Sequence, residues 1–91
     1  MRIDNSELKR LRSIASNMEA EFNIGKNGLT STFIESVDKY LDKYEIVKIK
    51  SLKAADKDEL EKVANEITEK LNAILVEVRG YTFVLYREKK K

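Results

Sequence analysis

The stretch FNIGKNGLTSTFIESV, residues 22–37, decides how the rest of the chain is arranged. Phe22 and Ile24 alternate with polar residues, a pattern typical of a short strand. The pattern stops at the turn GKNG, residues 25–28, which has a glycine at each end. Thr30 can then cap a helix whose apolar residues recur at helical spacing as far as Leu41. A strand is therefore expected to pass directly into a helix through a glycine-flanked turn.

Regular elements are also expected on both sides of this stretch. Before it, residues 5–20 carry a helical apolar stripe, and Asp4 followed by Glu7 resembles a capping box. After it, the β-branched run at residues 46–52 predicts a strand, and the stripe from Leu60 to Leu71 predicts a helix with acids at its amino end. Residues 74–79 and 82–87 read as two strands joined by a type II′ turn at Gly80. Pairing across that turn is expected to place Val76, Val78, Phe83 and Leu85 on one face and Glu77, Arg79, Thr82, Val84 and Tyr86 on the other.

The expected order of elements is thus α-β-α-β-α-β-β. This order predicts an α/β (α+β) fold with a single mixed four-stranded sheet and three helices. A chain of 91 residues has room for one hydrophobic core. We therefore expect a single domain over residues 1–88, followed by a short basic tail at residues 89–91.

The composition argues against catalysis and against metal binding. The chain contains neither histidine nor cysteine, which removes the commonest general base, the commonest metal ligands and the usual nucleophile pairs. The acids at residues 56–59 lack the other ligands of a calcium loop, and a helix amino end explains them better. We expect no enzyme activity, no cofactor and no small-molecule substrate. No membrane span and no secretory signal are expected either, which favours the cytoplasm.

The turn at residues 25–28 is the one stretch that looks built for a ligand. Glycines allow a close approach to the backbone, and free N–H groups at a helix start attract anions. The turn lacks the ending of a Walker A loop and the spacing of a dinucleotide fingerprint. What remains is G-x-x-G, the loop with which KH modules hold single-stranded nucleic acid. Alone the pattern is weak, because two glycines around a tight turn more often serve only the turn.

Four segments in order strengthen the pattern: LRSIA (residues 11–15), IGKNGLT (24–30), EIVKIK (45–50) and GYTFVLYR (80–87). Together they resemble the CRM domain, the YhbY-like RNA-binding family, over roughly residues 4–87. The resemblance implies a fold similar to the carboxy-terminal domain of translation initiation factor three, with the G-x-x-G loop holding RNA. Members of the family are associated with precursors of the large ribosomal subunit and, in plant organelles, with group II intron splicing.

The candidate RNA-binding residues follow from the loop, from the resemblance and from the basic positions around them. They are Gly25, Lys26, Asn27, Gly28, Thr30, Arg12, Lys48, Lys50, Arg79 and Arg87. Lys48 and Lys50 could equally be solvated charges at a sheet edge. Tyr81 and Tyr86 could stack on unpaired bases, although a packed or half-exposed tyrosine is the commoner outcome.

The sequence therefore predicts a non-enzymatic, monomeric protein that binds structured RNA. The resemblance points to ribosomal RNA of a large-subunit precursor and to ribosome assembly, with ribosomal proteins as further candidate partners. The alternative is a protein-interaction module that docks on a ribosomal protein or assembly factor through its sheet face or its third helix. The net charge of only +2 favours this alternative.

Overall fold

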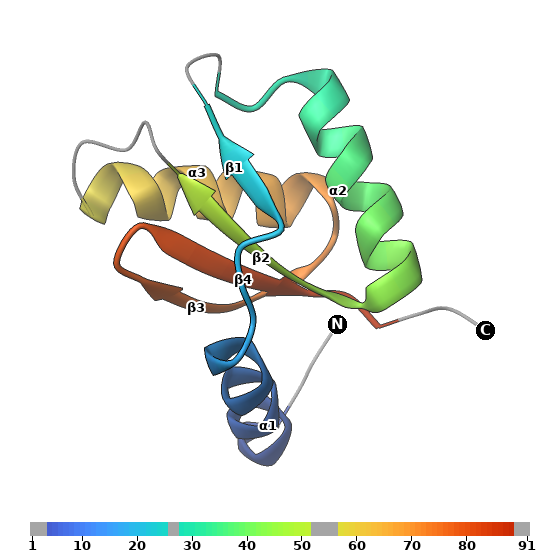
Figure 1. Cartoon of the computed structure of the whole chain (residues 1–91), viewed down its shortest axis with the longest axis vertical. Coiled ribbons are helices and arrows are strands. Elements are labelled where there is room, and N and C mark those ends of the chain that lie inside the picture. The colour runs from blue at the N-terminus through green and yellow to red at the C-terminus, as the bar shows by residue number, and fades with distance from the viewer. Residues whose placement is uncertain (1–3, 26–27, 52–56, 89–91) are drawn as a thin grey trace.

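The computed structural model of the chain describes residues 4–25, 28–51 and 57–88 (Figure 1). Lys26, Asn27 and the tail at residues 89–91 lie outside the described residues. The elements follow the predicted order: α1 (Asn5–Ser16), β1 (Phe22–Ile24), α2 (Ser31–Tyr44), β2 (Ile46–Ser51), α3 (Lys57–Lys70), β3 (Ile74–Arg79) and β4 (Thr82–Tyr86). None of the described helices is long and apolar enough to cross a membrane.

The four strands form one mixed sheet in the order β1-β2-β4-β3. β1 and β2 are parallel, and α2 is the crossover that such a pair requires. β4 runs antiparallel to both of its neighbours, β2 and β3. This arrangement confirms the predicted fold class and places β1, the strand that precedes the glycine turn, at one edge of the sheet (Figure 1).

Each face of the sheet has its own hydrophobic cluster, because successive strand residues point to opposite sides. On one face α2 and α3 enclose the main core, which includes Val37, Leu41, Leu60, Ile67, Val47, Ile49, Phe83 and Leu85. On the other face α1 packs with Leu11 and Ala15 against Val76 and Val84. Figure 1 shows α1 on its own, away from α2 and α3. One helix therefore covers only part of this second face.

The predicted position of Val76 is wrong, because β3 contains an irregularity. The register against β4 shifts between Leu75 and Glu77, so that Val76 is an extra residue on its strand. A bulge of this kind reverses the alternation on one side of it. Val76 therefore joins Val84 under α1, whereas Phe83 and Leu85 point to the main core.

The N-caps of α1 and α2 are the predicted residues, Asp4 and Thr30. The Asp4 carboxylate accepts a hydrogen bond of 2.8 Å from the N–H of Glu7, and the Thr30 hydroxyl accepts one of 3.1 Å from the N–H of Phe33. α1 ends at Ser16, four residues before its predicted end at Ala20. The chain then turns toward β1, and the carbonyl groups of Ala15, in the last turn of α1, and of Met18, two residues after the helix, come within reach of Lys48 on β2.

Candidate nucleic-acid interface

Gly25 and Gly28, the two residues of the G-x-x-G turn that the structure describes, leave their backbone accessible to a ligand. The N–H of Gly28 donates to the carbonyl oxygen of Gly25 at 3.0 Å, which closes the turn. Gly28 has φ +69°, a conformation that side-chain-bearing residues rarely adopt. A Cβ added at either glycine would meet no described atom within 4 Å. A ligand can therefore approach the backbone of Gly25 and Gly28 closely, shortly before α2 begins.

A row of four polar residues crosses the sheet beside this turn. The strand registers pair Asn23 with Lys50, Lys50 with Thr82, and Thr82 with Arg79. At about 4.8 Å between strands, these four residues span about 14 Å. We call them the polar row. Its first member, Asn23, lies two residues before Gly25, so the row begins next to the described start of the turn.

The polar row lies on the α1 side of the sheet but beyond the cluster that α1 covers. Asn23, Lys50 and Arg79 are exposed, and Thr82 is half-buried. Within the part of the chain that the structure describes, Lys50 and Arg79 form no ion pair. Glu77 is the next residue on this face of β3 and borders the row. The row thus offers two free positive charges and two neutral hydrogen-bonding groups.

Lys48 has a different role, although it shares a face with Lys50. Its ammonium group donates to the carbonyl oxygens of Ala15, at 3.3 Å, and Met18, at 3.2 Å. These carbonyl groups lie at the end of α1, where a cation is also favoured by the helix dipole. The structure therefore ties the Lys48 ammonium to α1, and we leave Lys48 out of the interface.

Arg87 is also bound within the molecule. Its guanidinium donates to the carboxylates of Asp38, at 2.7 Å, and Asp42, at 2.9 Å, both on α2. It also donates to the carbonyl oxygens of Asp38 and Leu71, each at 2.9 Å. With a side chain only 16% exposed, Arg87 joins the end of β4 to α2 and to the residue that follows α3. We therefore assign it a structural role and leave it out of the interface.

Arg12 remains a candidate by position. It is exposed on α1, next to the buried Leu11, and among the described residues it has no carboxylate partner. Because α1 and the polar row lie on the same side of the sheet, Arg12 can extend the charged surface. Its contact with a ligand stays a prediction.

The two tyrosines of the hairpin strands differ from each other. Tyr86 packs against the cluster under α1, and this burial, followed by the nearby Glu45 charge, raises its pKa. Tyr81 lies at the hairpin tip and is 59% exposed. The commoner, packed arrangement therefore holds for Tyr86, whereas Tyr81 is open to a ligand.

Asn23 and Thr82 are members of the row that the sequence does not mark as functional. Neither carries charge, and only the strand register places them between Lys50, Arg79 and the glycine turn. The alternation in β1 could have found Asn23, since it is the one polar residue between Phe22 and Ile24. Among the described residues, no group of three or more carboxylates, histidines or cysteines is arranged to hold a metal ion.

Comparisons with known proteins agree with this architecture. Residues 3–87 match the model of the CRS1 / YhbY (CRM) domain family. The "Probable RNA-binding protein YqeI" of Bacillus subtilis (strain 168) is 31% identical over 81 residues, which cover 89% of this chain and 83% of that protein. An "RNA-binding protein" of Haemophilus influenzae is 29% identical over 77 residues, covering 85% of this chain and 77% of that protein.

A solved structure is similar over almost the whole chain. The solution structure of the hypothetical protein SAV1595 from Staphylococcus aureus, described there as a candidate RNA-binding protein, superposes with a TM-score of 0.84. It is 31% identical and covers 99% of this chain and 93% of its own.

Proposed function

Because the chain belongs to the CRS1 / YhbY (CRM) domain family, we propose that it is an RNA-binding protein. Its interface consists of the G-x-x-G turn, the polar row and Arg12. The observation that carries this proposal is the polar row next to the glycine turn. Two cations that form no ion pair among the described residues lie side by side with two neutral hydrogen-bonding residues on one face of the sheet, and the open backbone of Gly25 follows Asn23 by two residues.

These groups suit a sugar-phosphate backbone better than they suit base edges. Lysine and arginine contacts to phosphate position a nucleic acid and carry no direct sequence information. Asn23 and Thr82 offer hydrogen-bonding groups that a 2′-hydroxyl can use as donor and acceptor. We therefore propose recognition of RNA by its shape and its 2′-hydroxyl groups, with Lys26 and Asn27 of the turn as further contacts.

The proposed target is structured ribosomal RNA of a large-subunit precursor, and the proposed role is ribosome assembly. The support is the association of the family with such precursors. The protein acts, on this proposal, as a cytoplasmic monomer without catalytic activity, and ribosomal proteins are candidate neighbours in the assembly. A net charge of +2 is too small for general attraction to any nucleic acid, so the proposed binding depends on the local interface.

The test is a titration into a fluorescent structured ribosomal RNA and into duplex DNA of equal length, across a series of salt concentrations. Two variants are compared with the wild type: Lys26→Asp/Asn27→Asp in the turn, and Lys50→Gln/Arg79→Gln in the row. The matched control is Lys62→Gln/Lys70→Gln, which removes two exposed charges from α3 on the opposite side of the sheet.

The wild type should prefer the RNA, and both interface variants should weaken binding. In the row variant Lys50→Gln/Arg79→Gln, the loss of two phosphate contacts should make the slope of log K against log salt shallower by about 1.5 to 2. The α3 control should leave the slope almost unchanged. Equal, weak binding of RNA and DNA by all four proteins would contradict the proposal.

One observation favours the alternative of a protein-interaction module. Phe22 of β1 packs edge-on against Phe33 and Tyr40 of α2, with ring centroids 5.8 and 5.4 Å away. Tyr40 in turn contacts Tyr44, which is 51% exposed. An exposed tyrosine at the end of an aromatic cluster is common in protein interfaces. If the wild type fails to bind RNA in the titration, this surface becomes the first one to examine.

A further inference from the structure

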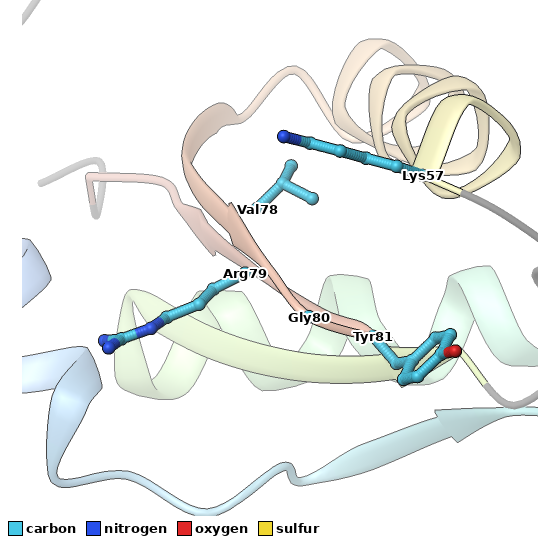
Figure 2. A pocket seen from close by; sticks show the side chains of 5 residues that line it. All are labelled: Lys57, Val78, Arg79, Gly80 and Tyr81. Carbon is cyan, nitrogen blue, oxygen red and sulfur yellow. The ribbon is translucent and has the colours of Figure 1, made fainter.

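We infer that the tip of the β3–β4 hairpin is a subsite for one unpaired nucleotide of the RNA, an inference that rests on the proposed function. A depression of about 530 Å³ lies between this tip and the start of α3. Its described lining is Lys57, Val78, Arg79, Gly80 and Tyr81 (Figure 2). Pockets of this size commonly hold small organic groups.

The hairpin tip is held in place before any ligand arrives. Its carbonyl group at Tyr81 accepts a hydrogen bond of 2.8 Å from the N–H of Ser51, the last residue of β2. The Thr82 hydroxyl donates to the carbonyl oxygen of Arg79 at 2.8 Å, across the turn. Gly80 has φ +60°, as a type II′ turn requires at its first position. A fixed tip lowers the entropy lost when a ligand binds to it.

The lining offers a surface for a flat ring. Tyr81 is 59% exposed although its backbone is fixed. Val78 supplies a half-buried apolar wall, and no described atom lies within 4 Å of the position that a Cβ of Gly80 would take. Stacking on an exposed aromatic side chain is how proteins hold bases without reading sequence strictly. An exposed aromatic side chain at the tip and an apolar wall on the Lys57 side of the hairpin thus line one depression, which fits a nucleobase.

The charges on the two sides of the hairpin differ, and they set the orientation of the nucleotide. Figure 2 shows Lys57 and Val78 on one side of the hairpin ribbon and the Arg79 side chain extending on the other. The Arg79 side carries the polar row and hence the proposed phosphate contacts. On the Lys57 side the exposed carboxylate of Asp58 follows directly on α3 and offsets the charge of Lys57, so this side attracts a phosphate less than the Arg79 side does. The phosphate therefore belongs with Arg79, and the base reaches over Tyr81 toward Lys57.

A base in this position has to be unpaired. Paired bases are stacked on both neighbours and hydrogen-bonded along their edges, so they cannot also lie on a tyrosine beside the duplex. The Lys57 ammonium can donate to a ring nitrogen or carbonyl oxygen of a free base edge. The RNA that this protein prefers should thus carry a bulged or looped nucleotide next to the segment held by the polar row.

The experiment compares two RNA hairpins that differ only by one bulged nucleotide. Affinities are measured for the wild type, Tyr81→Ala, Tyr81→Phe and the control Tyr44→Ala, which removes another exposed tyrosine away from the hairpin. Tyr81→Ala should weaken binding of the bulged RNA by about 5- to 150-fold. It should change binding of the fully paired RNA by less than about 2-fold. Tyr81→Phe and Tyr44→Ala should behave like the wild type with both RNAs.

A second readout uses the absence of tryptophan from the chain. A Tyr81→Trp variant places one indole at the hairpin tip, and a stacked base should quench its fluorescence with the bulged RNA only. Equal losses on both RNAs with Tyr81→Ala, or no loss on either, would overturn the subsite while leaving the proposed function intact. Failure of the wild type to bind either RNA would instead overturn the proposed function, and the subsite with it.

Discussion

Lys48 and Arg87 show how the role of a basic residue depends on what lies within reach of its charge. Both belong to segments on which the family resemblance rests. The charged group of each donates hydrogen bonds to backbone carbonyl oxygens. Lys50, two residues after Lys48 and on the same face, extends beyond the end of α1 and stays exposed. Sequence spacing places such residues on a face, but it does not show where a neighbouring helix ends.

Arg87→Gln should destabilise the fold. The change removes four hydrogen bonds that join β4 to α2 and to Leu71. Because the aspartates are largely solvated, we expect the free energy of unfolding to fall by about 2 kcal/mol. Urea unfolding measures this change, and the exposed Lys50→Gln is the control, with an expected effect below about 0.5 kcal/mol. A normal unfolding free energy with reduced RNA affinity would show that Arg87 contacts RNA after all.

Two tyrosines should make stability fall at high pH. Burial is the main cause that raises the pKa of Tyr40 and of Tyr86 above the ordinary value of 10.0, and nearby carboxylates raise both further. The folded state therefore holds these protons more tightly than the unfolded state. Their contribution to stability is complete below about pH 10 and is lost as the pH rises through the raised pKa values.

Urea midpoints between pH 8 and pH 11 test this expectation. A Tyr40→Phe/Tyr86→Phe variant should lose less stability over this range than the wild type, because its phenyl rings cannot ionise. Lysine titration is common to both proteins and cancels in the comparison. Parallel pH curves for the two proteins would show that neither tyrosine titrates differently in the folded state.

At the scale of elements, α1 is attached more lightly than the other two helices. Its buried contribution is Leu11 and Ala15, packed on Val76 and Val84, together with the hydrogen bonds from Lys48. α2 and α3 share the larger core on the opposite face. Elements with few buried contacts open at lower free energy than the rest of a fold. α1 should therefore be the first helix to exchange its amide hydrogens.

Leu11→Ala should loosen α1 selectively. Leu11 is 1% exposed, and a Leu→Ala change in a core costs about 2 to 5 kcal/mol. The matched control is Ile14→Ala on the same helix, where the side chain is 39% exposed and the cost should stay below about 1 kcal/mol. Hydrogen exchange should show lost protection in α1 with Leu11→Ala and not with the control. Equal protection in both variants would mean that α1 does not depend on this cluster.

The sequence predicts the elements well where local signals are strong. Alternation, helical stripes and the caps at Asp4 and Thr30 are properties of neighbouring residues, and the structure has the elements in the predicted order. The bulge at Val76 could not be predicted, because the consecutive apolar residues Ile74, Leu75 and Val76 suit either face of the sheet and only the pairing with β4 reveals the extra one. Because of this shift of one residue, Val76 faces the cluster under α1 and not the main core.

At the scale of the whole molecule, the two faces of the sheet have different chemistry. The face under α2 and α3 is filled by the main core, and the outer surface of α3 carries exposed carboxylates such as Glu61, Glu66 and Glu69. The other face is covered only in part, which leaves the polar row open beside the glycine turn. The small net charge conceals this difference, because α3 carries five acids against three lysines, whereas the polar row carries two bases and no acid.

The candidate site could be predicted only in part for the same reason. The turn at residues 25–28 is local, so the sequence alone shows it, and Lys50 and Arg79 stand out by their charge. Asn23 and Thr82 enter the site through pairing between strands that are far apart in the sequence. The subsite at the hairpin tip likewise depends on the start of α3 lying next to the turn at Gly80.

The central claim is that RNA lies across the glycine turn and the polar row. The most direct test is a titration of the ¹⁵N-labelled protein, which at 10.5 kDa suits NMR, with the structured ribosomal RNA fragment. The account predicts that the largest amide shifts cluster at the turn and along the row, at Asn23, Gly25, Gly28, Lys50, Arg79 and Thr82. The outer face of α3 and the aromatic end of α2 should stay unchanged. Shifts centred on Tyr40 and Tyr44, with the polar row unaffected, would contradict it.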